Sequence, residues 1–244
     1  MTIPSSARLA PKTRAIIDAY CEQVLTCPLS VARSGRVHVL SVPARGLPAW
    51  HGYTMPIVAI ALSTGAVIAC RPDLVEQLEM ALGSDVKLPA LDSAALRRVH
   101  RAVRRILPHA FTLGGDFRAV DGATFMPSKT SERAEHIADN DPAALHLRTR
   151  FDGALFGLRG PRGRLISYAA LKLKSASVWE IAVATEPDYR GRGYARDVVS
   201  AASRFALEHG RVPIYINDRD NSNSAFVARS LGYQRYCDIV LGEY

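Results

Sequence analysis

The most informative segment of this sequence is EPDYRGRGYAR, at residues 186–196. Before it, Ser177–Thr185 is rich in residues that favour β-strands. From Ala195 onward, apolar residues recur at helical spacing until Gly210, where we expect the helix to end. A further strand is predicted at Val212–Asn217 and a short helix at Ser224–Leu231. Strand, glycine loop, helix and strand in this order are typical of an α/β protein.

The loop within this segment has the features of a phosphate-binding site. It lies where a strand runs into a helix, so its amides include the unpaired first N–H groups of that helix. Those N–H groups and the helix dipole favour an anion. Gly191 and Gly193 would let a diphosphate approach the backbone, and Arg190, Arg192 and Arg196 add positive charge. A glycine turn that precedes a helix without binding any ligand is the alternative.

The two most familiar phosphate loops do not account for this segment. Gly193 is followed by Tyr194-Ala195-Arg196, which does not complete the dinucleotide pattern G-x-G-x-x-G, and no Gly-Lys-Ser/Thr closes a Walker loop. The segment instead resembles the acetyl-CoA loop of the GCN5-related N-acetyltransferase (GNAT) superfamily, Gln/Arg-x-x-Gly-x-Gly/Ala. Arg190, Gly193 and Ala195 stand at its fixed positions.

A second motif of the same family follows in the family's order. It is an Asn before a short helix that ends in Leu-Gly-Phe/Tyr, present here as Asn221 and Leu231–Tyr233. In detail, with Ser224, Val227 and Ala228 between these ends, the motif looks closest to the GNAT branch that includes the zwittermicin A resistance acetyltransferase. That branch implies a small amine as the acetyl acceptor.

The resemblance covers roughly residues 131–244, which we predict to be the acetyl-CoA-binding catalytic domain. It implies the GNAT fold, an α/β (α+β) architecture with a central mixed, mostly antiparallel sheet flanked by helices. Residues 1–130 are predicted to be an N-terminal α/β extension, or acceptor-side domain, that sets specificity. The elements expected there are a helix ending before Cys27-Pro28, a strand at Val37–Val42, a hairpin of Ile57–Leu62 and Ala66–Cys70, and a helix from Asp92 or Ser93 to Pro108.

The resemblance also implies which residues bind acetyl-CoA. In GNATs the strand before the loop exposes backbone groups that hold the pantetheine arm, the loop amides hold the pyrophosphate, and the Asn of the second motif contacts the arm. Carried over to this sequence, the predicted cofactor-binding residues are Val183, Ala184, Thr185, Arg190, Gly191, Arg192, Gly193, Tyr194, Ala195, Arg196, Asn221 and Ser224.

The chemistry requires a base, because an amine that resembles lysine has a pKa of about 10.4 and is protonated at neutral pH. Glu180 is the first candidate, since it lies in the strand that leads to the loop. The alternative is a carboxylate paired with an arginine or turned to solvent. Asn217 and Asp218, at the end of the next strand, are further candidates. Many GNATs have a tyrosine as the acid seven residues after the Asn, where this chain has Ala228.

These features predict an N-acetyltransferase that moves an acetyl group from acetyl-CoA to a primary amine of a small molecule. Two alternatives stay open. The first is a non-catalytic acyl-CoA-binding or regulatory module, for which Ala228 is the main support. The second is acetylation of a protein or aminoacyl-tRNA amine. The sequence leaves the oligomeric state open, a homodimer included.

Composition excludes several other classes of protein. The 244 residues include 48% hydrophobic and 22% charged residues, enough to form a packed core rather than a disordered chain. The stretch Gly46–Cys70 has no charged residue, yet its prolines and turn residues favour strands of a core over a membrane span. The four cysteines have no metal-binding spacing, so we expect reduced thiols in a cytoplasmic protein and no metal site.

The chain is basic, with 31 Lys and Arg against 23 Asp and Glu and a net charge of +8. One predicted helix concentrates this charge in five arginines. Such a stripe could bind nucleic acid, but a solvated outer face is the simpler interpretation, and charge alone does not predict a nucleic-acid partner. The arginines are Arg97, Arg98, Arg101, Arg104 and Arg105.

Overall fold

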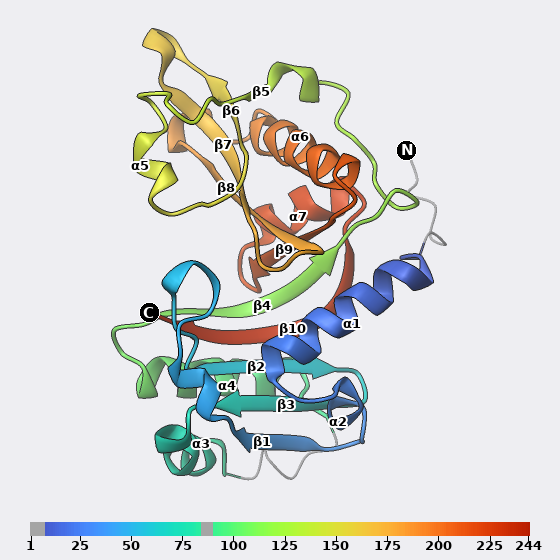
Figure 1. The fold of residues 1–244 in the computed structure, drawn as a ribbon, viewed down its shortest axis with the longest axis vertical. Helices are drawn as coiled ribbons and strands as arrows, with labels where there is room; N and C mark the ends of the chain where they lie inside the picture. The colour runs from blue at the N-terminus through green and yellow to red at the C-terminus, as the bar shows by residue number, and fades with distance from the viewer. Residues whose placement is uncertain (1–7, 84–89) are drawn as a thin grey trace. The chain divides into compact units, whose positions relative to one another are not determined.

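The computed structural model describes residues 8–83 and 90–244, which form two compact units (Figure 1). The first unit contains the described residues up to Ile16 together with Arg118–Ile216 and Asn221–Gln234. The second unit contains Ile17–Phe117, Asn217–Asp220 and Arg235–Tyr244. The division therefore differs from the boundary at residue 130 that the sequence suggests, because the chain passes between the units several times.

The second unit is built on strands in the order β1-β3-β2-β10-β4. β1 runs parallel to β3, and β2 pairs antiparallel with both β3 and β10. The predicted hairpin is confirmed, because the buried apolar runs of β2 and β3 flank a two-residue turn. The elements are α1 (Pro11–Leu25, which begins in the first unit), α2 (Leu29–Ala32), β1 (Val37–Ser41), η1 (Pro43–Gly46), η2 (Trp50–Gly52), β2 (Ile57–Leu62), β3 (Gly65–Cys70), η3 (Pro72–Leu74), α3 (Val75–Leu82), α4 (Ser93–Ile106), β4 (Phe111–Ala119) and β10 (Gln234–Glu243).

Helix α4 shows how the sequence pattern becomes packing in this unit. The carboxylate of Asp92 accepts a hydrogen bond from the amide of Ala95 at 2.7 Å, which is the predicted N-cap. Leu96, Val99 and Val103 are buried in one apolar cluster, whereas the arginines lie on the exposed side. The helix is thus stabilised because its apolar stripe packs in the core and a carboxylate accepts a hydrogen bond from its first turn.

The first unit has strands in the order β9-β8-β7-β6-β5. β8 and β9 are parallel, and the other pairs are antiparallel. This mixed, mostly antiparallel sheet with flanking helices confirms the predicted fold class. The elements are η5 (Ser131–Arg133), β5 (Glu135–His136), α5 (Leu145–Arg148), β6 (Leu155–Arg159), η6 (Pro161–Gly163), β7 (Leu165–Lys172), β8 (Val178–Thr185), η7 (Pro187–Tyr189), α6 (Tyr194–Glu208), β9 (Val212–Asp218) and α7 (Ser222–Ser230).

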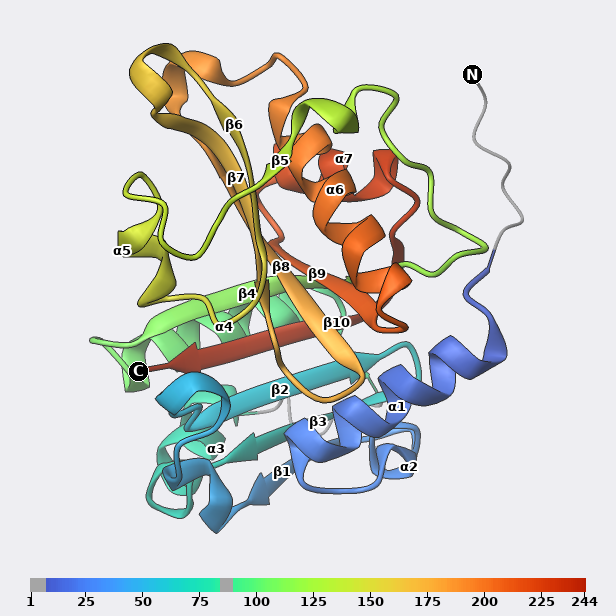
Figure 2. The ribbon, with the colours of Figure 1, turned by 45° about the horizontal axis from the view of Figure 1, so that its top comes forward.

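Helix α6 packs across β6, β7 and β8 (Figure 2). Its apolar face, which includes Val198, Ala202 and Ala206, is fully buried against Leu171 and Ile181 of the sheet. Burial of this face holds the helix on the sheet, and this positions the glycine loop that precedes the helix. Among the helices of the described ranges, none has the length and hydropathy that a membrane span needs.

The carboxylate of Asp121 ties the start of α1 to the turn after β4. It accepts hydrogen bonds from the amides of Ala10 at 2.7 Å and of Ala123 and Thr124 at 3.1 Å each. Burial raises the pKa of Asp121, but these hydrogen bonds more than offset that effect, so its pKa is lowered. The ionised carboxylate is thus the form that the folded chain stabilises.

We expect Asp121→Asn to lower the free energy of unfolding by about 1–2 kcal/mol at pH 7, because hydrogen bonds to a charged acceptor are lost. Since the folded pKa lies below the unfolded value of about 3.9, this contribution is present above that value and is lost as the pH falls through the folded pKa. Urea denaturation from pH 7 to pH 3 checks it. The control is Asp139→Asn, because Asp139 is 94% exposed and its loss should cost less than about 0.5 kcal/mol. Equal effects of the two substitutions would contradict the assignment.

Candidate functional site

Strand β8 separates from its neighbour β9 partway along its length. The two strands pair only as far as Glu180 and Ile214. β8 continues to Thr185 and stays paired with β7 on its other side. In the described structure, residues 181–185 therefore have no strand partner on the side of β9. The predicted role of Val183–Thr185 needs such an open edge, because only unpaired backbone groups are free to bind the arm of a ligand.

The turn before α6 presents an open backbone. Gly191 has φ of 75° and Gly193 has φ of 81°, a region that favours glycine. A Cβ atom at either position would meet no atom within 4 Å. Among the described backbone hydrogen bonds outside helices and strands, none is donated by an amide of residues 191–196, and the first comes from Asp197 to the carbonyl of Gly193 at 3.1 Å. The amides at this helix start are thus available to an anion.

The three arginines of the loop differ in their contacts. Arg190 Nε donates to the carbonyl of Thr185 at 3.1 Å, and Arg192 Nη2 donates to the carbonyl of Asp188 at 3.2 Å. Both side chains are thereby held against the residues that lead into the loop. The Nε of Arg196 is buried and has no hydrogen-bond partner among the residues described. An orphaned guanidinium nitrogen on a residue of the first helical turn, whose amides are unpaired, fits an anionic group such as the diphosphate of CoA.

The second motif places Asn221 at the start of α7. Its Oδ1 accepts a hydrogen bond from the amide of Ser224 at 2.9 Å, so Asn221 is the N-cap of this helix. The residue is exposed, and its Nδ2 donates no hydrogen bond to a described residue. The hydroxyl of Ser224 shares a hydrogen bond with Tyr215 Oη at 2.8 Å. Asn221 therefore keeps a free donor, whereas the Ser224 hydroxyl is already used to hold α7 on β9.

The position of the acid found in many GNATs carries no proton donor here. Ala228 is fully buried in α7. The nearby tyrosine of the second motif, Tyr233, is also buried, and its hydroxyl shares a hydrogen bond with Ser203 Oγ at 2.7 Å. Burial raises the pKa of Tyr233. Tyr233 is thus part of the core.

Glu180 lies in a buried ion-pair cluster on β8. Its carboxylate is 3.2 Å from Lys172 Nζ and 3.3 Å from Lys174 Nζ. Burial raises the pKa of Glu180, but the two ammonium groups more than offset this, so the pKa is lowered. Glu180 is therefore ionised at neutral pH but only weakly basic. The pairing corresponds to the alternative of an ion-paired carboxylate, with lysines in place of an arginine.

Asn217, the second predicted catalytic residue, belongs to the second unit. It is buried, and its Nδ2 donates to the carbonyl of Asp218 at 3.1 Å. A Cβ atom on Gly115 of β4 would lie only 1.8 Å from the carbonyl oxygen of Asn217. The backbone of Asn217 is therefore packed tightly against a glycine of β4.

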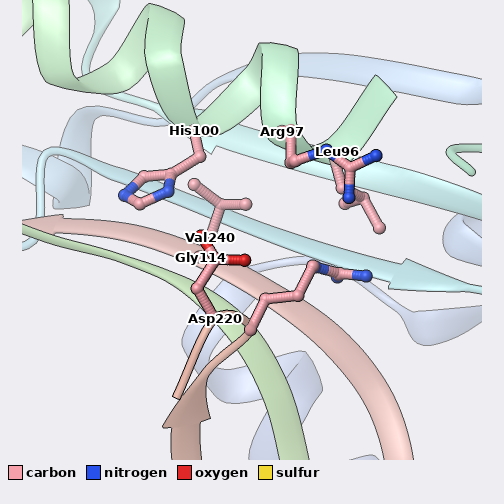
Figure 3. A pocket seen from close by; sticks show the side chains of 7 residues that line it. Leu96, Arg97, His100, Gly114, Asp220 and Val240 are labelled. Carbon is pink, nitrogen blue, oxygen red and sulfur yellow. The ribbon is translucent and has the colours of Figure 1, made fainter. Parts of the chain in front are cut away.

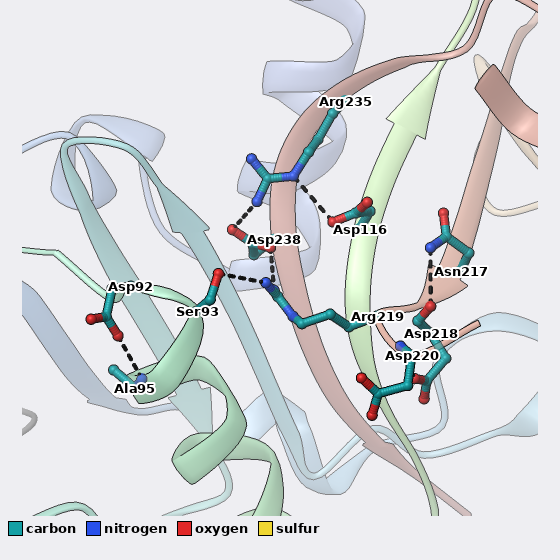
Figure 4. Close-up of polar contacts among 10 residues, drawn as sticks. All are labelled: Asp92, Ser93, Ala95, Asp116, Asn217, Asp218, Arg219, Asp220, Arg235 and Asp238. Atoms are coloured by element: carbon teal, nitrogen blue, oxygen red, sulfur yellow. Dashed lines mark hydrogen bonds and ion pairs between the residues drawn. The ribbon is translucent and has the colours of Figure 1, made fainter. Parts of the chain in front are cut away.

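An ion-pair network holds the turn that follows Asn217 (Figure 4). Arg219 pairs with Asp238, which also pairs with Arg235. Arg219 Nη1 in addition donates to Ser93 Oγ at 3.1 Å. The turn is thus fixed to both β10 and the start of α4.

A small pocket lies beside this turn in the second unit (Figure 3). His100 of α4 and Gly114 of β4 line it together with Arg219 and Asp220. Burial lowers the pKa of His100, so this ring is mostly neutral near pH 7. None of the predicted binding residues lines the pocket.

Sequence reasoning missed Asp197, a buried carboxylate in the first turn of α6. It accepts hydrogen bonds from Ser128 Oγ at 2.6 Å and Thr130 Oγ1 at 2.7 Å, and it pairs with Arg133. The helix dipole alone makes an acidic residue favourable in the first turn of a helix. The position of Asp197 in the sequence therefore gives no reason to expect side-chain partners. The partners come from a loop more than 60 residues earlier, as the separations of 64 to 69 residues show.

Residues 160–239 match the model of the GNAT acetyltransferase family. This range includes the loop, α6 and α7. None of the curated proteins matches the chain.

Several solved structures are similar to part of this chain. A protein described as an acetyltransferase of the GNAT family from Novosphingobium aromaticivorans is 22% identical, with a TM-score of 0.47 over 55% of this chain and 64% of that chain. This chain thus covers less than two thirds of that protein. A GCN5-related N-acetyltransferase from Kribbella flavida is 17% identical, with a TM-score of 0.43 over 61% of this chain and 74% of that one.

A third structure is the aminoglycoside N-acetyltransferase AAC(6')-Iy in complex with CoA. It is 19% identical to this chain, with a TM-score of 0.35, and the match covers 41% of this chain and 90% of that chain. At these TM-scores, similarity to the three structures does not indicate the substrate.

The glycine loop at the start of α6 and the second motif both lie within the matched range. Residues 160–239 are therefore similar to the GNAT acetyltransferase family.

Proposed function

We propose that this protein transfers an acetyl group from acetyl-CoA to a primary amine of a small molecule. The observation that supports this most is that two segments close together in the sequence both have unpaired backbone groups. The amides of residues 191–196 have no described acceptor outside helix α6, and the strand that leads to them has an unpaired edge at residues 181–185.

Acetyl-CoA, as a substrate, would supply an activated thioester carbonyl. The amides from Gly191 to Arg196 are the groups proposed to hold its diphosphate, and the open edge of Val183–Thr185 is proposed to hold its arm, with a contribution from the free donor of Asn221. An N–H of that edge aimed at the thioester oxygen would stabilise the charge that develops there by about 3 kcal/mol.

The acceptor amine must lose a proton before it attacks, because an alkyl ammonium group has a pKa of about 10 and is protonated at neutral pH. We propose that Glu180 receives this proton through water, since its carboxylate is ionised but buried between two lysines. Asn217 remains a further proposed catalytic residue. The low basicity of Glu180 implies that its effect is smaller than that of an unpaired base.

We expect Glu180→Gln to lower kcat at least about tenfold at pH 7 and to leave the Kd of acetyl-CoA within about twofold. The loss should shrink as the pH rises towards the pKa of the acceptor, because the amine then reaches the site already neutral. A pH profile of kcat with calorimetry of acetyl-CoA measures both quantities. An unchanged profile would exclude Glu180 as the proton acceptor.

Lys174→Gln is the matched control, because it leaves Glu180 in place and removes one of its two ammonium partners. The change should raise the pKa of Glu180, since Lys174 lowers it. If Glu180 titrates during catalysis, the acid limb of the kcat profile moves to higher pH in Lys174→Gln. A profile that loses amplitude without moving would indicate a purely structural ion pair.

A small amine from the class of antibiotics or metabolites is the proposed acceptor. The form of the motif between Asn221 and Tyr233 supports this choice, because it looks closest to the branch that includes the zwittermicin A resistance acetyltransferase. We propose that residues 1–130 contribute to acceptor selection, and that the protein works in the cytoplasm.

The function is tested with a panel of small amines and acetyl-CoA, with release of free thiol as the measurement. Turnover of at least one amine is expected. The buried Ala228 favours one other function, a non-catalytic acyl-CoA-binding module. Tight binding of acetyl-CoA without turnover on a wide panel would support that module, and competition by peptide or RNA would reveal a macromolecular acceptor.

A further inference from the structure

The loop segment Ser128–Arg133 is fastened along α6 by side chains from one face of the helix. The amide of Ser128 donates to Ser200 Oγ at 2.9 Å. Further along the helix, Arg204 Nη2 donates to Ser131 Oγ at 2.9 Å. Asp197 lies three residues before Ser200, so it faces the same segment. The start of α6 and this loop therefore form one hydrogen-bonded assembly within the first unit.

Arg133 occupies the end of this assembly that is nearest to the glycine loop. Its Nη2 pairs with Asp197, and its guanidinium carbon lies 5.7 Å from the ring centre of Tyr194, the first residue of α6. Its Nε donates weakly to the carbonyl of Thr130 at 3.4 Å. Arg133 is 50% exposed, and no described hydrogen bond uses its Nη1. It therefore has unused donors at the mouth of the helix that begins after Gly193.

The charge of Asp197 gives Arg133 a second role. The carboxylate is only 2% exposed and lies in the first turn of the helix whose amides are proposed to bind a diphosphate. A negative charge there stabilises the helix but repels a phosphate, since like charges at short range raise the energy of both. Arg133 compensates this charge and adds donors of its own, and a guanidinium is well suited to phosphate.

We propose that Arg133, outside both sequence motifs, is a further residue of the acyl-CoA site that contacts the diphosphate of the coenzyme. Asp197 and Tyr194 act as positioning residues, because they hold the guanidinium at the start of α6. This inference rests on the proposed function and extends it by one residue. It commits to the diphosphate rather than the 3′-phosphate, since Tyr194 directly follows the glycine loop.

The test compares two arginines that join the same loop to the same helix. Arg133→Gln is expected to weaken binding of CoA about tenfold. Arg204→Gln removes an equivalent contact ten residues further along α6, about 15 Å from Tyr194, and should change the Kd by less than about twofold. Arg133→Lys, which keeps the charge, should recover part of the affinity. Calorimetry with CoA measures all three.

A purely structural role for Arg133 is distinguished by a series of ligands. With dephospho-CoA, Arg133→Gln should lose the same factor of about ten. With acetyl-pantetheine, which has no diphosphate, its KM should stay within about twofold of the wild-type value. Three results would each overturn the proposal. Arg133→Gln could lose as much with acetyl-pantetheine as with CoA, or Arg204→Gln could lose as much CoA affinity as Arg133→Gln. Arg133→Gln could also bind dephospho-CoA as tightly as the wild type does.

Failure of this inference can be separated from failure of the proposed function. If Gly193→Val binds CoA normally, the loop itself is not the coenzyme site and both proposals fall. If Gly193→Val loses CoA while Arg133→Gln binds it normally, the loop assignment stands and only the role of Arg133 is refuted.

Discussion

Replacing Gly193 with valine is expected to weaken binding of CoA about 100-fold or more. A branched side chain would occupy the open space above the turn, where a Cβ atom meets no protein atom within 4 Å. It would thereby keep a diphosphate from the amides of the loop. Charge-assisted hydrogen bonds of this kind contribute about 1.5–3 kcal/mol each, and a tenfold change in Kd corresponds to about 1.4 kcal/mol. Loss of two such bonds gives the expected factor.

Backbone strain alone must be separated from this effect, since Gly193 has a positive φ of 81°. Gly210→Val is the matched control, because Gly210 has φ of 68°, has equally open surroundings, and follows the other end of α6. Both variants should lose about 1–2 kcal/mol of stability, but only Gly193→Val should lose CoA. Calorimetry with thermal denaturation measures both. Equal CoA affinity in the two variants would refute the loop assignment.

Gly232→Ala is expected to have the largest effect on stability, about 2–5 kcal/mol. A Cβ atom at Gly232 would lie 1.8 Å from the carbonyl oxygen of Thr124, and the residue has φ of 86°. The backbone would have to move apart, which breaks the hydrogen bond from Met126 N to Leu231 O at 3.0 Å. The estimate combines about 1–3 kcal/mol for overpacking with about 1–2 kcal/mol for the left-handed conformation.

This loss is a large part of the 5–15 kcal/mol that stabilises a typical protein, so a reduced yield of soluble Gly232→Ala is part of the expected result. Gly210→Ala is the control, since it has a positive φ without a close neighbour and should cost only about 1–2 kcal/mol. Urea denaturation measures the difference. If Gly232→Ala unfolds within about 1 kcal/mol of the control, steric contact with Thr124 is not what requires glycine there.

This result gives a physical meaning to the Leu-Gly-Tyr end of the second motif. Gly232 lets the chain after α7 pass directly against the backbone at Thr124, and Tyr233 then reaches Ser203 of α6 in the core. The motif therefore serves packing at its end and presents a free side-chain donor at its start, where Asn221 lies. A sequence pattern alone does not separate these two purposes.

Elements with local sequence signals could be predicted before the structure was known. The apolar runs at Ile57–Leu62 and Ala66–Cys70, the helical stripe of α4 with its Asp92 cap, and the strand–loop–helix order around residues 186–196 all appear where they were predicted. The helix after the loop begins one residue earlier than predicted, at Tyr194. These signals are local because periodicity, capping and glycine turns each depend on neighbouring residues.

Two strands lacked such signals. β4 (Phe111–Ala119) contains Gly114-Gly115 and charged residues, and β10 (Gln234–Glu243) begins with polar ones, so neither shows a clear pattern. β10 becomes a strand because it pairs with β2, as in the pair Ile239 and Ile60. Hydrogen bonds with residues so far away in the chain cannot be read from a local window.

The same distinction applies to the candidate site. The glycine loop and the Asn221 that begins α7 could be predicted from local sequence, because each depends on residues that are close together in the chain. Only the tertiary structure placed Lys172 and Lys174 beside Glu180 and brought Arg133 to the first turn of α6. Charges interact through space rather than along the backbone, so the basicity of Glu180 and the partners of Asp197 were decided by folding.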